Sequence, residues 1–537
     1  MRSRRATAGL FSILTAFAWS LAVPPGADAQ TPKRGGTLRV SYGNEIANLD
    51  FHTAPGYEMM WVAMNVGCGL VNITPDGKFV GDAAESWQST PDGLLHTFKL
   101  RKNVLFHDGT PVDAAAVKFS IDRLMDPATK SGMRTFYDPV HSVEVLDPLT
   151  VQIRLKQPYA FLFHMLAAYR TGLVLYSPTA TQKYTLEDRK QGKPGAVVGC
   201  GPFKLVEWIK GSHLAMERFD KYFVPGEPHL DRIMIRVIKD PVTEMAAFQA
   251  GEIDFIASFS PEHVDTMRTQ NPTAKILTGK ETTPMLAAMK VTVPRDGKPM
   301  SKDRMPHPIF GDLRMRKAIG CYGIDRQEIV KIAFKGQATP WVGMAPPGTL
   351  ESVDVNARCP YDQAKAKALL AEMGYGPSKP LTFEVMADTE KSVFNVIATV
   401  IKEQMARIGV TANIRLVDKV SWMNTTLQDG PWDMYVEDLL SLLTIDSNGY
   451  LSNSTSSWSH PRHNDKRVDE IYARYARELD SAKRQAIGKE LVEFMADNMY
   501  WNNVSGSPFY MVVQPWVKGY VYNAEFEVHF SQVWLDK

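Results

Sequence analysis

Residues 85–126, ESWQSTPDGLLHTFKLRKNVLFHDGTPVDAAAVKFSIDRLMD, combine extended patterns, two turn signals and a helix pattern. The turn signals are two Asp-Gly pairs, which favour tight turns because glycine adopts positive φ without strain. Between them, apolar Phe98 and Leu100 alternate with polar residues, as in a half-buried strand. Asp113 can then cap a helix whose apolar residues fall on one face. From the residues alone we predict a strand, turn and helix unit of an α/β domain.

The stretch also belongs to a longer ordered series of sequence elements. The elements within and beside it are Ala84–Trp87, Pro91–Gly93, Thr97–Arg101, Val104, Phe106–Gly109 and the helix Ala114–Arg123. Further elements follow at Gly199–Leu205, Gly251–Asp254 and Val517–Tyr520. Together they resemble the family 5 extracellular solute-binding proteins, which are the peptide, nickel and oligopeptide receptors of bacterial ABC importers. The resemblance extends from about residue 35 to residue 522.

This resemblance implies an α/β fold, the bilobed periplasmic-binding-protein fold of the large type, with an extra domain inserted in lobe one. The implied division is a signal peptide at 1–29, lobe one at 30–78, 200–280 and 508–537, the inserted domain at 79–199 and lobe two at 281–507. The solute would bind between the lobes, and the closed form would dock on a membrane ABC permease. The implied function is that of a monomeric periplasmic receptor that delivers a peptide or peptide-like small solute to an importer.

The first 29 residues have the pattern of a secretory signal peptide. Three arginines among the first five residues precede the apolar segment 10–23, and Ala27-Asp28-Ala29 offers small residues for cleavage. The apolar segment is shorter than the roughly 20 residues that a membrane-spanning helix needs. We therefore expect export to the periplasm and cleavage after Ala29.

Charge and length limit the classes of partner and architecture. Removal of the expected signal takes three arginines and one aspartate from 61 basic and 59 acidic residues, which leaves a formally neutral chain. A neutral chain does not favour nucleic acid as a partner, because nucleic acid attracts basic surfaces. The mature chain is also longer than one hydrophobic core usually supports, so at least two lobes are expected.

The four cysteines are Cys68, Cys200, Cys321 and Cys359. An exported chain enters an oxidising compartment, which permits disulfides, and four cysteines allow three pairings. Their spacings match no zinc motif, and buried free thiols stay an alternative. The family resemblance favours Cys68 with Cys200 and Cys321 with Cys359, because the implied fold places each pair in one lobe.

An exported hydrolase is the alternative function, and it rests only on the export signal and the size of the chain. The sequence contains no G-x-S-x-G, no H-E-x-x-H, no P-loop and no dinucleotide fingerprint. His460 and His463 could bind a metal, but their polar, proline-containing stretch is more typical of a surface loop. We therefore expect no enzymatic activity, no cofactor and no metal. A metal chelate as the solute, or a sensory role, stays open.

The segment 420–451 is the part of the sequence that best indicates which class of solute binds. In peptide-binding relatives a tryptophan begins it, matched here by Trp422, and a strand matched here by Trp432-Asp433 follows. A Trp-x-Ala-Asp stretch comes next in those relatives, and its aspartate holds the α-amino group of the peptide. In this chain the corresponding position falls near Leu442. A buried ammonium needs a paired carboxylate, so the charge would have to come from another position.

Three carboxylates near this segment could supply that charge. The two at the end of the predicted strand could equally lie in solvent, and the two tryptophans could equally be core residues. The resemblance adds the loop after the first strand, which faces the ligand cleft in relatives. The candidate ligand contacts are therefore Phe51, His52, Trp422, Trp432, Glu437, Asp438 and Asp446.

Overall fold

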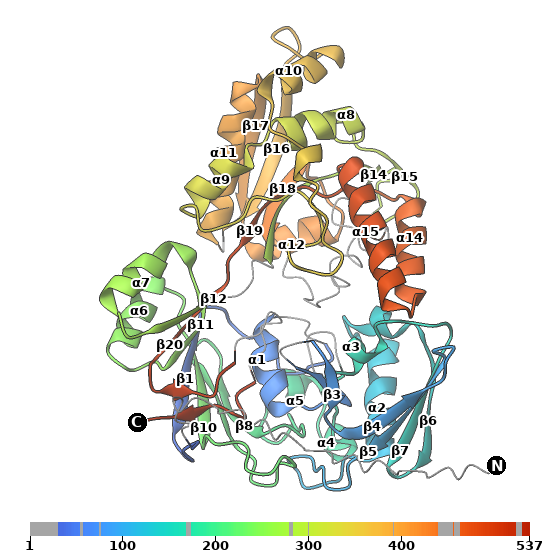
Figure 1. Cartoon of the computed structure of the whole chain (residues 1–537), viewed down its shortest axis with the longest axis vertical. Helices are drawn as coiled ribbons and strands as arrows, with labels where there is room; N and C mark the ends of the chain where they lie inside the picture. The colour runs from blue at the N-terminus through green and yellow to red at the C-terminus, as the bar shows by residue number, and fades with distance from the viewer. Residues whose placement is uncertain are drawn as a thin grey trace, which may run out of the picture. The chain divides into compact units, whose positions relative to one another are not determined.

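The computed structural model describes residues 31–53, 57–74, 77–167, 173–278, 283–298, 300–389, 391–438, 455, 462–521 and 529–537. The expected signal peptide, together with Asp446 and His460, lies outside the described residues. Lys33–Lys537 form one compact unit (Figure 1). Its main sheets have seven, five and four strands, and we call them the first, second and third sheets. Among the described residues, no helix has both the length and the apolar character of a membrane span.

The first sheet gathers strands that are far apart in the sequence. Its order is β12 (Lys275–Thr278), β20 (Tyr510–Val513), β11 (Phe255–Phe259), β1 (Thr37–Tyr42), β10 (Arg232–Val237), β9 (His213–Arg218) and β8 (Phe203–Ile209). Strand β1 is parallel to β10 and β11, whereas β20 runs antiparallel to β11 and β12. Helices α1 (Tyr57–Val66), α6 (Pro241–Gln249) and α7 (Val264–Gln270) accompany it, with the 3-10 turn η3 (Pro261–His263). The chain therefore returns to the first sheet near its C-terminus, where β20 pairs with β11 and β12.

The second sheet has the order β17 (Val410–Val417), β16 (Leu381–Asp388), β18 (Met434–Asp438), β13 (Thr283–Met289) and β19 (Asn503–Ser507). Strand β16 is parallel to both of its neighbours. Helix α11 (Ser392–Arg407) connects β16 to β17, and α12 (Lys419–Leu427) connects β17 to β18. The strand order therefore reverses at β16. In open α/β sheets, ligands bind outside the carboxyl ends of the strands at such a point.

Both faces of the second sheet are covered at its central strand β18. On one face, Met434 and Val436 of β18 share a core with Phe394 and Ile397 of α11. On the other face, Tyr435 packs against α12. The remaining helices around this sheet are α8 (Leu313–Arg316), the π-helix η4 (Lys317–Tyr322), α9 (Arg326–Ala333), η5 (Asn356–Arg358), α10 (Gln363–Glu372), α14 (Lys466–Arg477) and α15 (Ser481–Asp497).

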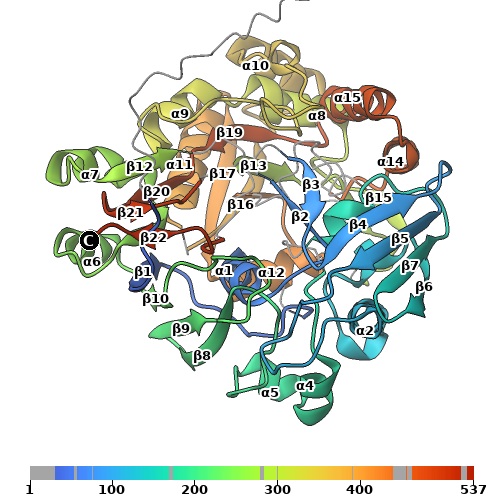
Figure 2. The same ribbon diagram turned by 60° about the horizontal axis from the view of Figure 1, so that its bottom comes forward.

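The third sheet contains the stretch that opened the sequence analysis. Its order is β4 (Ala84–Ser89), β5 (Leu95–Leu100), β7 (Thr150–Leu155) and β6 (Val140–Asp147), and α2 (Ala114–Met125) contacts β6 and β7 (Figure 2). Asp113 caps α2, because its carboxylate accepts a hydrogen bond from the N–H of Ala116. Gly93 and Gly109 have φ of 65° and 85°, as their turns require. The predicted strand, turns and helix are all present.

Shorter elements lie beside the first and third sheets. They are β2 (Val71–Ile73) with β3 (Phe79–Gly81), β21 (Val517–Lys518) with β22 (Trp534–Leu535), α3 (Leu162–Leu166), α4 (Pro178–Lys183), α5 (Leu186–Lys190), η1 (Pro127–Thr129) and η2 (Arg134–Tyr137). A hairpin of β14 (Thr292–Pro294) and β15 (Arg304–Pro306) extends from the second sheet. The division of strands among the sheets is compatible with the expected lobes, whose boundaries stay a prediction.

Helix α14 contacts the region of the third sheet. The N–H of Ala160 donates to the carbonyl oxygen of Ala476 at 2.8 Å, and the rings of Phe161 and Tyr475 lie 5.2 Å apart. Residues expected in lobe two therefore touch residues expected in the inserted domain at a point outside the connections between the lobes.

Two disulfides join Cys68 to Cys200 and Cys321 to Cys359, which is the pairing that the resemblance implies. The first holds the segment before β8 against the end of α1. Glycine is needed beside it, because a Cβ on Gly201 would lie 2.5 Å from the carbonyl oxygen of Gly67.

Candidate functional site

A cavity of about 500 Å³ lies between the first and second sheets. The end of β1 at Tyr42 and the start of α6 line it from the first sheet. Met285 of β13, Lys391 at the start of α11 and Asp438 at the end of β18 line it from the second. The link between β19 and β20, residues 508–509, completes the lining. The cavity therefore meets the carboxyl end of β18, next to the reversal point at β16, and its volume is ordinary for a small-molecule site.

The start of α11 forms one wall of this cavity. Lys391 is the N-cap of the helix, and no side chain among the described residues caps it. By contrast, Asp240 caps α6 and Asp418 caps α12. The ammonium of Lys391 forms an ion pair with the carboxylate of Asp438. Because Asp438 neutralises Lys391, the first-turn N–H groups and the helix dipole remain as the local attraction for an anion.

Glu244 of α6 forms the opposite wall. Its residue is 5% exposed, and Oε1 has no hydrogen-bond partner among the described residues. Burial raises the pKa of this carboxyl group to about 7, and the neighbouring hydroxyl of Ser41 lowers it by less. The carboxyl group is therefore neutral at acidic pH and ionises near neutral pH.

A group of paired charges lies behind the cavity at the carboxyl ends of β16 and β18. The Nζ atom of Lys419 lies 3.2 Å from Oδ2 of Asp388 and 3.7 Å from Oε1 of Glu437. Burial raises the pKa of Glu437 to about 8, although the ammonium of Lys419 opposes the increase and the carboxylates of Asp438 and Asp388 add to it. Of the two expected carboxylates at the end of β18, Asp438 therefore lines the cavity and Glu437 lies next to it.

Trp422 and Trp432 are core residues of the second sheet and do not line the cavity. They are 3% and 4% exposed, and their rings lie 5.4 Å and 4.7 Å from the ring of Tyr435. Lys419 and Lys290 place their ammonium groups 4.6 Å and 5.1 Å from the two indole rings. Both tryptophans therefore support the strand that carries the charged groups.

Phe51 and His52 also lie away from the cavity, in a buried junction between the first and third sheets. They are 8% and 0% exposed. The N–H of Phe51 donates to the hydroxyl of Tyr176 at 2.7 Å, and Nε2 of His52 lies 2.8 Å from the carbonyl oxygen of Val174. The structure therefore gives both residues a packing role, in place of the expected position in a loop that faces the ligand.

The burial of Phe51 and His52 follows from ion pairs made by the neighbouring carboxylate of Asp50. Nη2 of Arg123 lies 2.5 Å and Nε of Arg189 lies 3.1 Å from Oδ2 of Asp50, and all three side chains are buried. Burial, followed by the charge of Arg123, lowers the pKa of His52 to about 3, so its imidazole is neutral. The loop after β1 is therefore held by an ion triplet.

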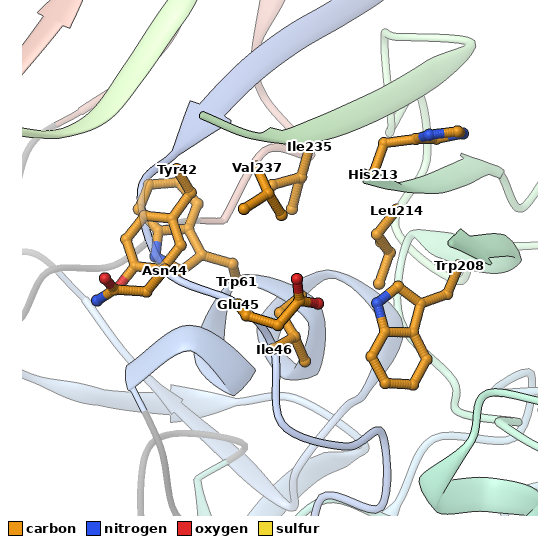
Figure 3. Close-up of a pocket in the computed structure, with 10 residues that line it drawn as sticks. All are labelled: Tyr42, Asn44, Glu45, Ile46, Trp61, Trp208, His213, Leu214, Ile235 and Val237. Atoms are coloured by element: carbon orange, nitrogen blue, oxygen red, sulfur yellow. The ribbon is translucent and has the colours of Figure 1, made fainter. Parts of the chain in front are cut away.

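A second, much smaller cavity of about 10 Å³ lies within the first sheet's unit (Figure 3). Tyr42, Trp61 and Trp208 are among the residues that line it. This volume is about that of one water molecule, so it does not offer a solute site. Within the part of the chain that the structure describes, no three His, Cys, Asp or Glu side chains gather as a metal site would require.

Two features of the larger cavity are absent from the expected site, namely Glu244 and the start of α11. A signal for the first is present in the sequence, because Glu244 and Phe248 lie four residues apart and therefore on one face of the helix. A carboxylate on the apolar face of a helix is unusual and marks a position to examine. The missing cap of α11 has a weaker signal, a lysine where α2, α14 and α15 have aspartate.

Comparison with known proteins identifies the family. Residues 78–460 match the family model described as bacterial extracellular solute-binding proteins, family 5. The chain belongs to this family. It is 31% identical over 379 residues to the glutathione-binding protein GsiB of Escherichia coli (strain K12), which covers 71% of this chain and 69% of that protein. The identity to GsiB of Salmonella paratyphi A is 32% over 381 residues, with the same coverage.

Solved structures of family 5 proteins show the same fold. The binding protein AgaA from A. tumefaciens R10, solved with agropinic acid, is 26% identical with a TM-score of 0.78, and the match covers 93% of this chain and 99% of AgaA. The binding protein DppA of Helicobacter pylori, solved with the peptide STSA, is 21% identical with a TM-score of 0.80 and a coverage of 94% and 99%. The expected bilobed periplasmic-binding-protein fold and the expected family are confirmed. As a member, the chain is a solute-binding receptor of ABC importers, a class of binding proteins and not of enzymes.

Proposed function

We propose that this receptor binds a peptide or peptide-like small solute in the cavity between its lobes and delivers it to a membrane ABC importer. The observation that carries the proposal is the cavity itself, which both lobes line with charged side chains. The relatives named for glutathione and solved with the peptide STSA support a peptide-like solute.

Closure follows from the position of this cavity. A solute that contacts both lobes gains more contacts when the lobes approach, so it stabilises the closed state by its difference in affinity for the two states. Micromolar to nanomolar binding corresponds to roughly −8 to −12 kcal/mol, which a buried cavity with a few polar anchors can supply. The closed form is then the one that docks on the permease.

The test is a titration of the purified mature protein. Glutathione, dipeptides and tripeptides are titrated in turn by calorimetry, and native mass spectrometry weighs any solute that the protein retains from its own periplasm. We expect one of these solutes to bind with micromolar or tighter affinity.

A variant that fills the cavity locates the site. Ser258 of β11 lines the cavity and is exposed, so Ser258→Trp should abolish binding while circular dichroism stays unchanged. Ser212, exposed in the turn between β8 and β9, provides the matched control Ser212→Trp, which should bind normally. Absence of binding by every peptide, or full binding by Ser258→Trp, would contradict the proposal.

The periplasmic location is part of the proposal. We infer that the signal at residues 1–29 directs export and that the mature chain begins after Ala29, as its small residues at the cleavage site favour. The intact mass of the exported protein tests the cleavage position, and light scattering tests the proposed monomeric state. A mass that retains residues 1–29, or a stable dimer, would correct these points.

A further inference from the structure

The contact between α14 and the third sheet is separate from the chain connections between the first and second sheets. The chain passes from β12 to β13 and returns from β19 to β20, so a rotation of one lobe relative to the other would turn about these links. The contact involves Ala160, Phe161, Tyr475 and Ala476, which belong to neither link. It can survive such a rotation only if the same lobe carries both of its sides.

The third sheet and α3 are fixed to the first sheet. The carboxylate of Asp50, in the loop after β1, pairs with Arg123 of α2 and Arg189 of α5, and all three side chains are buried. The N–H of Leu70, just before β2, donates to the carbonyl oxygen of Leu166 at the end of α3, at 2.9 Å. This side of the contact therefore moves together with the first sheet.

Helices α14 and α15 are fixed to the second sheet. The hydroxyl of Tyr475 donates to Oε1 of Glu351 at 3.1 Å, and both residues are buried. Nε of Arg316 in α8 donates to the carbonyl oxygen of Asn498, just after α15, at 3.0 Å, and its neighbour Met315 lies in the core of the second sheet. The two sides of the contact therefore belong to different lobes, and opening of the lobes must separate them.

The contact has the chemistry of a surface that can part. The N–H of Ala160 donates to the carbonyl oxygen of Ala476, one of the last carbonyl groups of α14, which an α-helix does not satisfy itself. Leu479, between α14 and α15, is 43% exposed and reaches the turn between β4 and β5, where a Cβ on Gly93 would lie 2.7 Å from its Cδ1. Water can replace the hydrogen bond after separation, so only a limited apolar area is then hydrated.

We propose that this contact is a latch, which forms when the lobes close around a solute and separates when they open. The proposal rests on the proposed function, because it concerns closure of the same receptor. It goes beyond that function by giving the expected inserted domain a role, although no described residue of the third sheet lines the cavity. A latch favours the closed state without touching the solute, so it raises the affinity for every solute by the same factor.

A pair of cysteines tests whether the contact opens. In the variant Gly93→Cys with Leu479→Cys, the new Sγ at position 479 replaces the Cγ of leucine, which lies 3.6 Å from the Cβ position at 93 and within reach of a disulfide. The control is Gly109→Cys with Leu479→Cys. Gly109 also follows an aspartate in a turn and has a φ of 85°, but no described atom lies within 4 Å of its Cβ position.

Small-angle X-ray scattering compares the two oxidised mature proteins without solute. We expect the cross-linked variant to have the smaller radius of gyration, because the link holds the lobes closed. Equal radii would mean that the contact is a permanent joint, and failure of the link to form would mean that Gly93 and Leu479 are not neighbours in solution. Either result overturns the latch, and neither touches the proposed function, because no solute is present.

A second pair of variants connects the latch to affinity. Leu479→Asp places a charge against the turn between β4 and β5, and Leu416 of the edge strand β17, 46% exposed, provides the control Leu416→Asp. We expect Leu479→Asp to bind each solute of the wild type roughly fivefold more weakly, and the control to bind normally. An unchanged affinity, or a loss for one solute alone, overturns the latch. Absence of binding by the wild type overturns the proposed function, and the scattering result still decides the latch.

Discussion

Replacement of Glu244 by glutamine should stabilise the ligand-free protein, and the gain should depend on pH. Burial raises the pKa of this carboxyl group from 4.5 to about 7. The folded protein therefore holds the proton more tightly than the unfolded chain does. By linkage, the contribution of Glu244 to stability is full below pH 4.5 and is lost as the pH rises to about 7. Glutamine does not titrate, so the variant keeps the stability that the wild type loses.

The size of the effect follows from the two pKa values. A difference between 4.5 and about 7 corresponds to roughly 3 kcal/mol, at about 1.4 kcal/mol for each pH unit. The variant and the wild type should therefore unfold with similar free energies near pH 4, where both side chains are neutral. The free energy of unfolding of Glu244→Gln should exceed that of the wild type by about 2–3 kcal/mol at pH 8.

Urea denaturation at several pH values between 4 and 8 measures this difference, with Glu252→Gln as the exposed control. The control should follow the wild type within about 0.5 kcal/mol at every pH. A constant difference between Glu244→Gln and the wild type across this range, or a variant less stable at pH 8, would refute the reasoning. Either result would mean that folding does not raise the pKa of the Glu244 carboxyl group.

Two further predictions concern the frame around the site. Asp50→Asn should lower the free energy of unfolding by about 3–5 kcal/mol, because Arg123 and Arg189 would stay buried without a counter-charge; a loss below about 1 kcal/mol in urea denaturation would contradict this. Replacement of both Cys68 and Cys200 by alanine should cost about 2–5 kcal/mol, because their disulfide spans 132 residues of sequence. Thermal unfolding checks this loss, and an unchanged melting temperature would count against it.

The sequence predicts elements well where the signals are local. Asp113 caps α2 through the N–H of Ala116, three residues away, and Phe98 alternates with polar neighbours along β5. Such patterns depend on the backbone within one turn or one strand, so they can be read without the rest of the chain. The family resemblance then supplies the long-range arrangement that local patterns do not contain.

The site is predicted less well, because burial depends on contacts between distant segments. Phe51 and His52 are buried because Arg123 and Arg189, which are 73 and 139 residues from Asp50, reach its carboxylate. Nothing in the loop itself indicates that convergence. The family resemblance predicts that the loop after β1 faces the ligand cleft. It does not predict which side chains of this chain pack around that loop.

The ion-pair partners of the carboxylates at the end of β18 are also not predictable from the sequence. Asp438, expected as a ligand contact, lies at the end of β18 and lines the cavity, and its role toward a ligand stays a prediction. The sequence does not show that Lys391 and Lys419 already pair with Asp438 and Glu437. A carboxylate that has a lysine partner offers less to a ligand cation than an unpaired carboxylate does.

This contrast bears on how closure is driven. A solute shifts the balance between open and closed states only by the difference in its affinity for them, and a change from 1:99 to 99:1 requires about 5.5 kcal/mol. Groups that are already paired contribute little to such a difference. The uncapped start of α11 can contribute up to about 2 kcal/mol of such a difference toward a negatively charged group. Because residues of both the first and the second sheet line the cavity, a solute that contacts both makes all of its interactions only when the lobes approach, so unpaired groups in the lining are the ones that can couple binding to closure.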